Sequence, residues 1–381
     1  MPDDFDVCLL AHRFDDPLPS GIGRYYDDVV AALRALDPAP ATWRVVGGAR
    51  PRSDGASRTA HVDFGRDNRP WYLAWGTLGW PPGDRHLGSP DLVHQLHAFA
   101  PIITRCPLVT TVHDLLPFQH PSWYSRRERL LHRSSLRVVA DRAAAIVVDS
   151  AFVGDQLVDE AGIDRSRITV VPLAVDAGLW QSVPTAGSTH LGELTTLARI
   201  GVHPRRYLIA VGQLTDRKNL TVVLDALSDV PPEVVPTLVI AGSSGPGASR
   251  VHAAIAARGL NDRVVLAGYL SQADLAVVVA NAFALVHPSL AEGFGLPPLE
   301  AMASGVPTIS SAAGSLPEVV GRAGDLVDPH DAAAWATGIV ELSDTDTWAR
   351  RRRDGLARAD AYGWPAHAAA LVELYRAVLS R

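Results

Sequence analysis

The chain has 381 residues, more than a single hydrophobic core usually organises, so its length predicts about two domains. Hydrophobic residues make up 47% of the sequence and charged residues 20%, which excludes a largely disordered chain. The 35 basic and 41 acidic side chains give a formal net charge of −6, so nucleic acid is not expected as a partner.

Cysteine content and the absence of long apolar runs bear on location. The two cysteines, Cys8 and Cys106, offer neither a disulfide framework nor a cysteine zinc site, which fits a reducing compartment. The first residues, MPDDFDVCLL, are acidic and lack the basic flank and long apolar core of a signal peptide. No run approaches the roughly 20 apolar residues of a membrane span. We therefore expect a cytoplasmic protein, either soluble or peripheral to the inner face of the membrane.

Short, β-branched apolar runs alternate with helical patterns along nearly the whole chain. In the first half, the runs that predict strands are Asp6–Ala11, Asp91–Leu96, Leu108–His113, Ala145–Asp149 and Ile168–Pro172. In the second half they are Tyr207–Gly212, Thr237–Gly242, Val264–Tyr269, Phe283–Pro288 and Val306–Ser311. Helices are predicted at Arg24–Leu36, Ser271–Ala282 and Pro365–Leu379. Continuously apolar strands separated by helices are typical of parallel sheets covered on both faces, so the predicted fold class is α/β.

The alternation occurs once in each half, which predicts two Rossmann-like, doubly wound domains. We place the first domain over 1–176 and the second over 202–362, joined by a linker region over 177–201 that is rich in Gly, Ser and Thr. The segment 363–381 carries a helix that either stays with the second domain or packs back on the first. Ligands of such sheets bind beyond the carboxyl ends of the strands, so two facing domains would form a cleft.

The first loop of interest begins the helix that follows the first strand. Gly21 and Gly23 allow a ligand to approach the backbone closely, and the N–H groups of a helix start favour an anion. Arg24 follows directly. A tight turn without a ligand explains the two glycines equally well. The third glycine of a dinucleotide fingerprint is missing, which disfavours an oxidoreductase.

The second loop contains His113 and Asp114 at the end of a predicted strand. A histidine in this position can bond a substrate hydroxyl or stabilise charge near neutral pH. The alternative is a histidine that is satisfied by the backbone of the loop. No Gly-x-Ser-x-Gly motif is present, so Asp114 is not expected to belong to a Ser-His-Asp triad.

The third loop, Val211–Leu220, follows the first strand of the second domain and carries Arg217 and Lys218. Two cations at a helix start can neutralise a leaving diphosphate without a metal ion. The alternative is a solvated pair of charges.

The fourth loop carries the most specific pattern, His287–Gly305. Glu292 is predicted on the loop after a strand, and Glu300 in the first turns of the helix that follows, which Pro297 and Pro298 would open. Carboxylates placed in this way can accept hydrogen bonds from two sets of hydroxyls, as a sugar and a ribose offer. Glu300 alone is also explained by its interaction with the helix dipole, but that explains neither Glu292 nor the glycines around Phe294.

This segment closely resembles the Glu-x7-Glu motif of retaining glycosyltransferases with the GT-B fold, in the family 4 group that includes bacterial mannosyltransferases. Other segments resemble family signatures in family order. They are Gly21–Tyr25, Val112–Leu115, His120–Pro121, Val171–Pro172, Val175–Asp176, Arg217–Asn219, Gly314–Val320 and Asp325–Pro329. The resemblance implies a GT-B fold whose first domain binds the acceptor and whose second domain binds a nucleotide-sugar donor.

The resemblance also implies roles for residues of this sequence. Gly23 would approach the donor diphosphate or the acceptor, His113 would lie beside the reacting sugar, and Lys218 with Arg217 would hold the diphosphate. The donor sugar would be bound by Glu292, Gly293, Phe294, Gly295 and Leu296, and the ribose by Glu300. Gly21, Arg24 and Asp114 would lie on the acceptor side. Gln213 stands where many members have arginine, so Lys218 and Arg217 would bear the whole diphosphate charge.

The implied reaction moves a hexose, with mannose from GDP-mannose favoured, to a hydroxyl of a glycan, a lipid-linked sugar or a small molecule, with retention of configuration. We expect no cofactor and no metal, because Asp4–Asp6 and Asp344–Asp346 are not placed at strand ends as a metal-binding Asp-x-Asp would be. Two alternatives remain at this point. One is a nucleotide-sugar epimerase or hydrolase of the same fold, and the other is a non-catalytic regulator that binds sugar nucleotides.

Two further features are candidates for the acceptor side. Trp71 and Trp75 have faces that stack on sugars or acyl chains, although helical spacing makes core residues the alternative. Four arginines are spaced to align on one helix face, where they would contact anionic lipid or form a solvated surface. They are Arg126, Arg129, Arg133 and Arg137.

Overall fold

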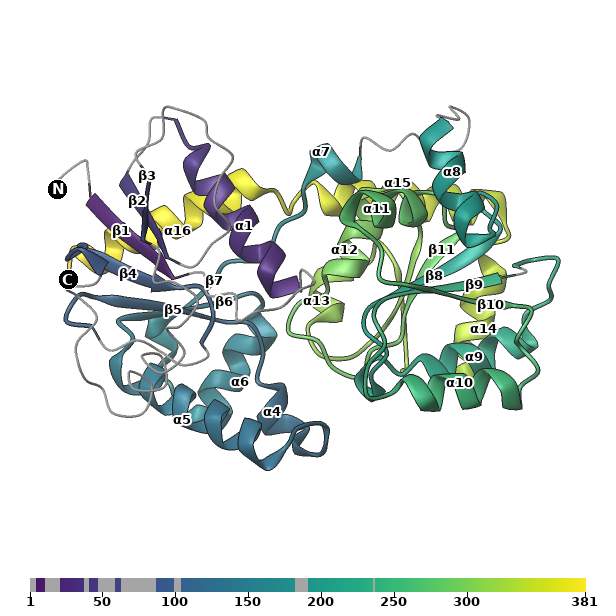
Figure 1. Cartoon of the computed structure of the whole chain (residues 1–381), viewed down its shortest axis with the longest axis horizontal. Coiled ribbons are helices and arrows are strands. Elements are labelled where there is room, and N and C mark those ends of the chain that lie inside the picture. Colours follow the sequence, from purple (N-terminus) through teal and green to yellow (C-terminus); the bar gives the residue numbers. More distant parts are fainter. Residues whose placement is uncertain are drawn as a thin grey trace. The chain divides into compact units, whose positions relative to one another are not determined.

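The computed structural model describes residues 5–10, 21–37, 41–46, 59–62, 87–98, 104–181, 191–235 and 237–381. The chain divides into two compact units. The first is made of Met1–Ala174 with Trp364–Arg381, and the second of Val175–Gly363. Each unit contains one parallel sheet with helices on both faces (Figure 1), so the predicted α/β class with two Rossmann-like domains is confirmed.

The sheet of the first unit has the strand order β3-β2-β1-β4-β5-β6-β7, with every neighbouring pair parallel. Its strands are β1 (Phe5–Leu10), β2 (Ala41–Val46), β3 (Thr59–Val62), β4 (Leu92–Gln95), β5 (Leu108–Val112), β6 (Ala145–Val148) and β7 (Ile168–Val170). Among the described residues, α1 (Gly21–Arg34) and α16 (Trp364–Leu379) lie on one face (Figure 1). The other face carries α5 (Arg126–Arg142) and α6 (Ala151–Ala161), and the short α4 (Leu116–Gln119) precedes α5.

Local sequence explains where these helices begin and end. Every residue of β4, β5 and β6 is buried, as expected of a parallel sheet covered on both faces, and this includes polar residues of β4 and β5. The helix α5 begins at a capping box, in which the Glu128 N–H donates to Ser125 Oγ at 3.2 Å and the Ser125 N–H to Glu128 Oε2 at 2.7 Å. The helix α6 ends at Gly162, whose φ of 63° favours glycine.

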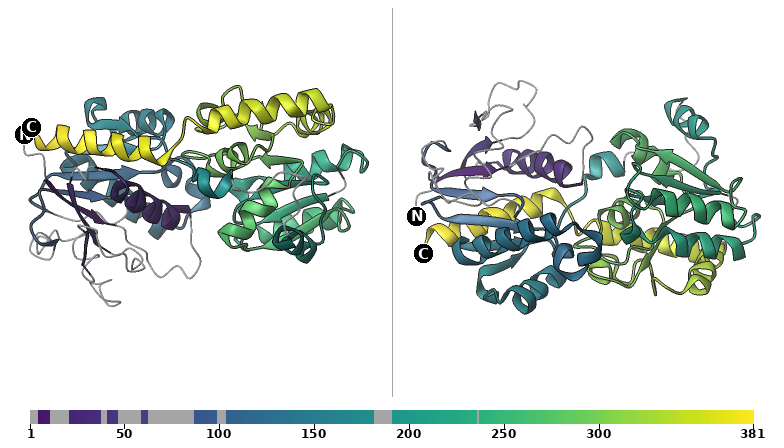
Figure 2. Two further views of the ribbon diagram at one scale, coloured as in Figure 1. Left: turned by 90° about the horizontal axis from the view of Figure 1, so that it is seen from above. Right: turned by 60° about the horizontal axis from the view of Figure 1, so that its bottom comes forward.

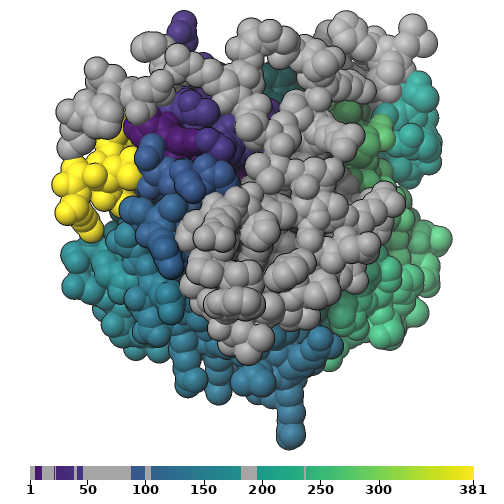
Figure 3. Space-filling view, turned by 60° about the vertical axis from the view of Figure 1, so that its left-hand side comes forward, coloured from purple at the N-terminus to yellow at the C-terminus, as the bar shows by residue number. Residues whose placement is uncertain are grey.

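The last helix, α16, belongs to the first unit and packs against α1. Two polar contacts tie it to the sheet. Tyr375 Oη lies 2.6 Å from His94 Nδ1 on β4, and His367 Nδ1 lies 2.7 Å from the carbonyl oxygen of Pro172. The space-filling view shows the yellow end of α16 at the surface beside the purple and blue segments of the same unit (Figure 3).

The sheet of the second unit has the order β10-β9-β8-β11-β12-β13 and is also parallel throughout. Its strands are β8 (Tyr207–Val211), β9 (Thr237–Ala241), β10 (Val264–Gly268), β11 (Ala284–His287), β12 (Thr308–Ser311) and β13 (Asp325–Val327). The chain builds outward from β8 to β10 and then returns to place β11 on the other side of β8. The carboxyl ends of β8 and β11 therefore form a topological switch point, where open α/β sheets bind their ligands.

Helices cover both faces of this second sheet (Figures 1 and 2). On one face lie α9 (Leu220–Asp229), α10 (Ala248–Ala257) and α14 (Ala332–Glu341). On the other lie α8 (Leu191–Ile200), α11 (Gln272–Ala280), α12 (Leu296–Ala303) and α15 (Thr345–Ala359). The described part of this unit also contains the shorter helices α7 (Ala177–Trp180) and α13 (Leu316–Val320).

The structure corrects several expectations about elements. The strands β2, β3 and β13 are not predicted by the sequence patterns, and the helix expected at Arg24–Leu36 lies instead at Gly21–Arg34. In β2 the apolar run is interrupted by Arg44, whose guanidinium forms an ion pair with Asp6 on β1. In β13 only three residues pair with β12, which is too short a run for periodicity to detect.

Candidate functional site

The site is built where β8 and β11 end. The chain leaves β8 through Gly212 and reaches a short 3-10 turn, Asp216–Lys218. It leaves β11 at His287 and passes Glu292 before α12 begins. Because β8 and β11 are parallel neighbours, these two loops emerge at the same edge of the sheet.

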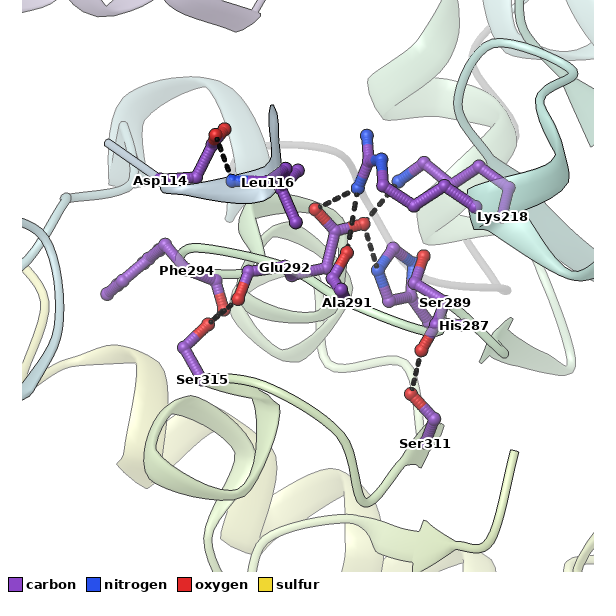
Figure 4. Close-up of polar contacts among 11 residues, drawn as sticks. Asp114, Leu116, Lys218, His287, Ser289, Ala291, Glu292, Phe294, Ser311 and Ser315 are labelled. Carbon is purple, nitrogen blue, oxygen red and sulfur yellow. Dashed lines mark hydrogen bonds and ion pairs between the residues drawn. The ribbon is translucent and has the colours of Figure 1, made fainter. Parts of the chain in front are cut away.

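At this edge one carboxylate bridges two cations (Figure 4). Lys218 Nζ donates to Glu292 Oε1 at 2.7 Å, and Arg217 Nη1 lies 2.5 Å from Glu292 Oε2. Arg217 Nη1 also donates to the carbonyl oxygen of Ala291 at 3.0 Å. The side chains of Lys218 and Glu292 are only 12% and 14% exposed, and Lys218 is the only lysine in the chain. The structure therefore brings together three of the predicted site residues as one ion-pair cluster.

Backbone contacts hold the Glu292 loop in place. The N–H and the Oγ of Ser315 donate to the carbonyl oxygen of Glu292 at 3.2 and 2.9 Å, and Ser315 Oγ donates to the carbonyl oxygen of Phe294 at 2.6 Å (Figure 4). Gly314 has a φ of 61°, and a Cβ there would lie 2.7 Å from the Glu292 carbonyl oxygen. The Leu290 N–H donates to the carbonyl oxygen of Arg217 at 2.9 Å, which joins the two loops.

The turn that carries Lys218 is shaped by the residues on either side of it. Gly212 has a φ of 140°, and a Cβ there would lie 2.6 Å from Lys218 Cε. Asn219 adopts a left-handed conformation, with a φ of 49°, and its Nδ2 donates to the carbonyl oxygens of Pro288 and Pro329 at 3.2 and 2.6 Å. These contacts fix both ends of the turn and leave no room beside the lysine stem.

Burial and charge act in opposite directions on the pKa values of the cluster. Burial alone would raise the pKa of Glu292, but Lys218 and Arg217 hold it well below its usual value. Burial lowers the pKa of Lys218, and the opposing effect of Glu292 does not fully restore it. Burial and the nearby Lys218 lower the pKa of His287 to about 4, so this ring is neutral at pH 7. The cluster thus combines two cations and one anion.

His287 is a site residue that the sequence analysis quotes in the motif but does not single out. Its Nε2 lies 3.3 Å from Glu292 Oε1, and its side chain is only 2% exposed. The signal that points to it is its place as the last residue of β11, directly at the switch point.

The remaining donor-side residues surround the start of α12. Leu296 is its first residue, Gly295 precedes it with a φ of 127°, and Gly293 is half-buried. The Phe294 ring is buried and meets Tyr362 edge-on, with ring centroids 5.8 Å apart. Glu300 belongs to α12 and is only 4% exposed. Its predicted contact with a ribose stays a prediction. Gln213 is exposed, and its Nε2 donates to the Ser244 carbonyl oxygen at 3.4 Å.

In the first unit, His113 is engaged at both ring nitrogens. Nδ1 lies 2.7 Å from Asp149 Oδ2, and Nε2 lies 3.0 Å from the carbonyl oxygen of Leu96. A carboxylate and a carbonyl both accept hydrogen bonds, so these partners favour the protonated ring, in which both nitrogens donate. Burial lowers the pKa of His113, but the charge and hydrogen bond of Asp149 outweigh it and the pKa is raised. Asp149, which follows β6, is the second site residue that the sequence analysis missed.

We expect Asp149→Asn to lower the pKa of His113, because burial continues to lower it while the charge of Asp149, which raises it, is removed. A raised pKa means that protonated His113 stabilises the fold at pH values below its unfolded pKa, and that this contribution is lost as the pH rises through the folded pKa. NMR titration of the imidazole C–H resonances measures the change. Asp155→Asn, which removes an exposed carboxylate paired with Arg165, is the control and should leave the titration unchanged. An unchanged pKa in Asp149→Asn would contradict the assignment.

The other acceptor-side candidates occupy the first unit or fall outside the description. Gly21, Gly23 and Arg24 form the first turn of α1, and Tyr25, next in that turn, meets His113 edge-on at 4.9 Å between ring centroids. Asp114 Oδ1 accepts from the Leu116 N–H at 3.1 Å and so positions the start of α4 (Figure 4).

Trp71 and Trp75 lie outside the described residues.

The arginines predicted to share a face do so on α5. Arg126, Arg133 and Arg137 are exposed, and Arg129 is half-buried. Leu130, between them, is 68% exposed. Contact of this face with an anionic membrane surface stays a prediction. Among the helices that the structure describes, none has the length and apolar character needed to cross a membrane.

Comparison with known proteins identifies the family. Residues 199–355 match the family described as glycosyl transferases group 1, and residues 19–179 match glycosyltransferase family 4. A D-inositol 3-phosphate glycosyltransferase from Streptomyces scabiei is 31% identical over 84% of this chain and 69% of its own length. The chain belongs to glycosyltransferase family 4. It is therefore a transferase enzyme, as the resemblance implies.

A second curated relative and a solved structure are also similar to this glycosyltransferase. The O-antigen chain mannosyltransferase RfbU from Salmonella typhimurium is 25% identical over 72% of this chain and 71% of its own length. Across the first curated relatives, the chain spans 65 to 71% of the relative's length. The crystal structure of Anabaena HepE in complex with UDP and glucose has a TM-score of 0.74 at 20% identity and covers 98% of this chain and 100% of that chain. This likeness shows the GT-B fold.

Proposed function

We propose that this glycosyltransferase moves a hexose from a nucleotide sugar to a hydroxyl acceptor, with retention of configuration and without a metal ion. The observation that carries the proposal is the cluster of Lys218, Arg217 and Glu292 at the switch point between β8 and β11. Two cations at this position suit the diphosphate of a donor, and a carboxylate beside them suits the hydroxyls of its sugar.

The proposed mechanism assigns the main catalytic effect to charge stabilisation. Lys218 and Arg217 stabilise the negative charge that develops on the leaving diphosphate, while Glu292 accepts hydrogen bonds from the donor sugar. The acceptor hydroxyl attacks the anomeric carbon on the face from which the diphosphate leaves, and its proton passes to the leaving phosphate oxygen. The two acceptors around His113 favour its protonated form, which would contribute positive charge and could not act as a base, in keeping with this route for the proton.

Names of the relatives support a mannose-type donor. RfbU from Salmonella typhimurium is an O-antigen chain mannosyltransferase, and the Streptomyces scabiei relative acts on D-inositol 3-phosphate. The mannosyltransferase name agrees with mannose as the transferred sugar, and the family resemblance favours GDP-mannose as its donor. The proposed acceptor is a hydroxyl of a glycan, a lipid-linked sugar or a small molecule. Metal independence is supported by the two cations of the cluster.

Thermal unfolding with GDP, UDP, dTDP and ADP, each with and without EDTA, tests the donor site. A nucleotide that binds only the folded state stabilises it by about 2.7 kcal/mol at one hundred times its Kd. We expect GDP to raise the midpoint, with or without EDTA. A larger shift with another nucleotide would replace GDP as the donor class, and loss of the shift with EDTA would overturn metal independence. No shift with any nucleotide would overturn the donor site.

Nucleotide release then separates the transferase from the other functions of this fold. We expect GDP release from GDP-mannose to depend on an added acceptor. Release without any acceptor would indicate a hydrolase or epimerase. Binding without turnover, whichever acceptor is supplied, would indicate a regulator.

A further inference from the structure

We propose that Glu292 is an internal counter-ion that competes with the donor diphosphate for Lys218 and Arg217, and that re-formation of these ion pairs promotes release of the nucleoside diphosphate product. This inference rests on the proposed function, because it requires the donor to bind at the switch point. It assigns Glu292 a second task beyond contact with the sugar.

Each oxygen of the Glu292 carboxylate faces one of the two cations, and His287 Nε2 lies 3.3 Å from the oxygen that faces Lys218. One oxygen of Glu292 faces Lys218 Nζ at 2.7 Å and the other faces Arg217 Nη1 at 2.5 Å. Both are short, charge-assisted contacts between side chains that are largely removed from water. A diphosphate that uses the same cations must therefore share them with Glu292 or displace it.

The surrounding contacts confine any exchange to the carboxylate itself. The main chain of Glu292 is held by Ser315 and cannot follow a displaced side chain. The stem of Lys218 passes so close to Gly212 that a Cβ there would clash with it. The glutamate side chain, in contrast, turns about its own single bonds. The lysine and the loop backbone thus form a fixed frame in which one anion replaces another.

The charges of the cluster indicate whether Glu292 or the diphosphate contacts the two cations when the diphosphate is absent and when it is bound. His287 is neutral, so within these ion pairs two cations face the single carboxylate of Glu292, and the charge of Glu300 also acts on Lys218. A diphosphate brings at least two negative charges, and a carboxylate kept between it and the cations would meet like charge. Binding of the diphosphate therefore turns Glu292 away from at least one cation.

The free-energy cost of displacing Glu292 depends on whether a donor sugar is bound. With a nucleotide sugar bound, hydroxyls of the sugar donate to the displaced carboxylate and replace the ion pairs that it loses. After transfer the sugar has gone, and the nucleoside diphosphate offers no such donors. Glu292 then competes for its cations without compensation. The cluster therefore discriminates between substrate and product, and weakens binding of the product.

Isothermal titration calorimetry of wild type and Glu292→Gln with GDP and GDP-mannose tests this, or with whichever nucleotide pair the thermal shifts select. The amide removes the competing charge, so we expect GDP to bind about tenfold more tightly, which corresponds to the loss of one charge-assisted interaction. GDP-mannose should not gain equally, because the amide is a poorer acceptor for sugar hydroxyls. Glu292→Asp, which keeps a shorter carboxylate, should strengthen GDP binding by about two- to threefold, and serves if the amide variant does not fold.

Asp216→Asn is the matched control. It removes a negative charge from the same turn, but Asp216 pairs with the exposed Arg250 at 3.2 Å and not with the cluster. Its effect on GDP affinity should stay below about twofold, as for other exposed ion pairs. An equal gain in GDP affinity in Asp216→Asn and Glu292→Gln would mean that removing any nearby negative charge has the same effect, and it would overturn the inference. Wild type that binds GDP while neither Glu292 variant binds it more tightly would also overturn it, with the proposed function intact. Wild type that binds no nucleotide would instead overturn the proposed function.

Discussion

Replacing Lys218 with arginine is expected to lower the transfer rate by about 10²-fold, although the positive charge is kept, because a displaced donor group loses most of its stabilising effect. The lysine side chain is 12% exposed, and Gly212 packs against its stem so tightly that no Cβ fits between them. The planar guanidinium of arginine is wider than the compact ammonium of lysine, so it does not fit beside Gly212 and its charge would lie at a different position. Lys218→Met removes the charge as well, and we expect about 10³-fold loss.

Steady-state transfer assays at saturating acceptor measure these losses. Arg250→Met is the control, because it removes a cation that is 68% exposed and pairs with Asp216 on the same turn. Its rate should remain within about twofold of wild type. Lys218→Arg with wild-type activity would show that any cation suffices and would contradict the role of the packed stem.

The only lysine of the chain also provides a direct probe of the site. Acylation of amines followed by mass spectrometry of the peptide that contains Lys218 reports how accessible Nζ is, without interference from other lysines. A bound nucleoside diphosphate is expected to protect it. This readout is independent of turnover, so it distinguishes a variant that no longer binds from one that binds but no longer transfers.

Much of this site is visible in the sequence because its signals are local. A strand that ends in glycine, a pair of basic residues and a loop that leads into a proline-opened helix identify Lys218 and Glu292 as candidates. Their ion pair is not visible. It depends on the order of strands in the sheet, in which β11 returns to the side of β8 although β9 and β10 lie between them in the chain. No local pattern encodes that return.

The same physical reason explains the missed partners. Asp149 meets His113 because β5 and β6 are neighbours in the sheet, so residues that follow the two strands emerge together. In the sequence, Asp149 only ends an apolar run. His287 reads as the last residue of a strand, and its effect on the cluster follows from burial beside Lys218. Sequence patterns therefore locate the loops, while the topology decides which side chains meet.

Gly242→Ala is expected to be the most destabilising single-methyl substitution that the described glycines offer. Gly242 follows β9, and a Cβ there would lie 1.9 Å from the carbonyl oxygen of Gly212 and 2.4 Å from its carbonyl carbon. Both atoms belong to the main chain, so no rotamer change relieves the clash. Gly212 is itself fixed, because its N–H donates to the Ala241 carbonyl oxygen at 2.9 Å. Moving either strand end would break the sheet edge that positions Lys218. We expect a loss of more than about 3 kcal/mol in the free energy of unfolding.

Urea unfolding followed by circular dichroism measures this loss, with Gly338→Ala as the matched control. Gly338 lies within α14, and a Cβ there would lie 3.6 Å from Ile309 Cδ1, an ordinary contact. Alanine is also the better helix former by about 1 kcal/mol, so this variant should unfold at the same urea concentration or a higher one. Equal midpoints for the two variants would mean that the ends of β8 and β9 move apart easily. The fixed frame around Lys218 would then fail as an explanation of both its packing and its intolerance of arginine.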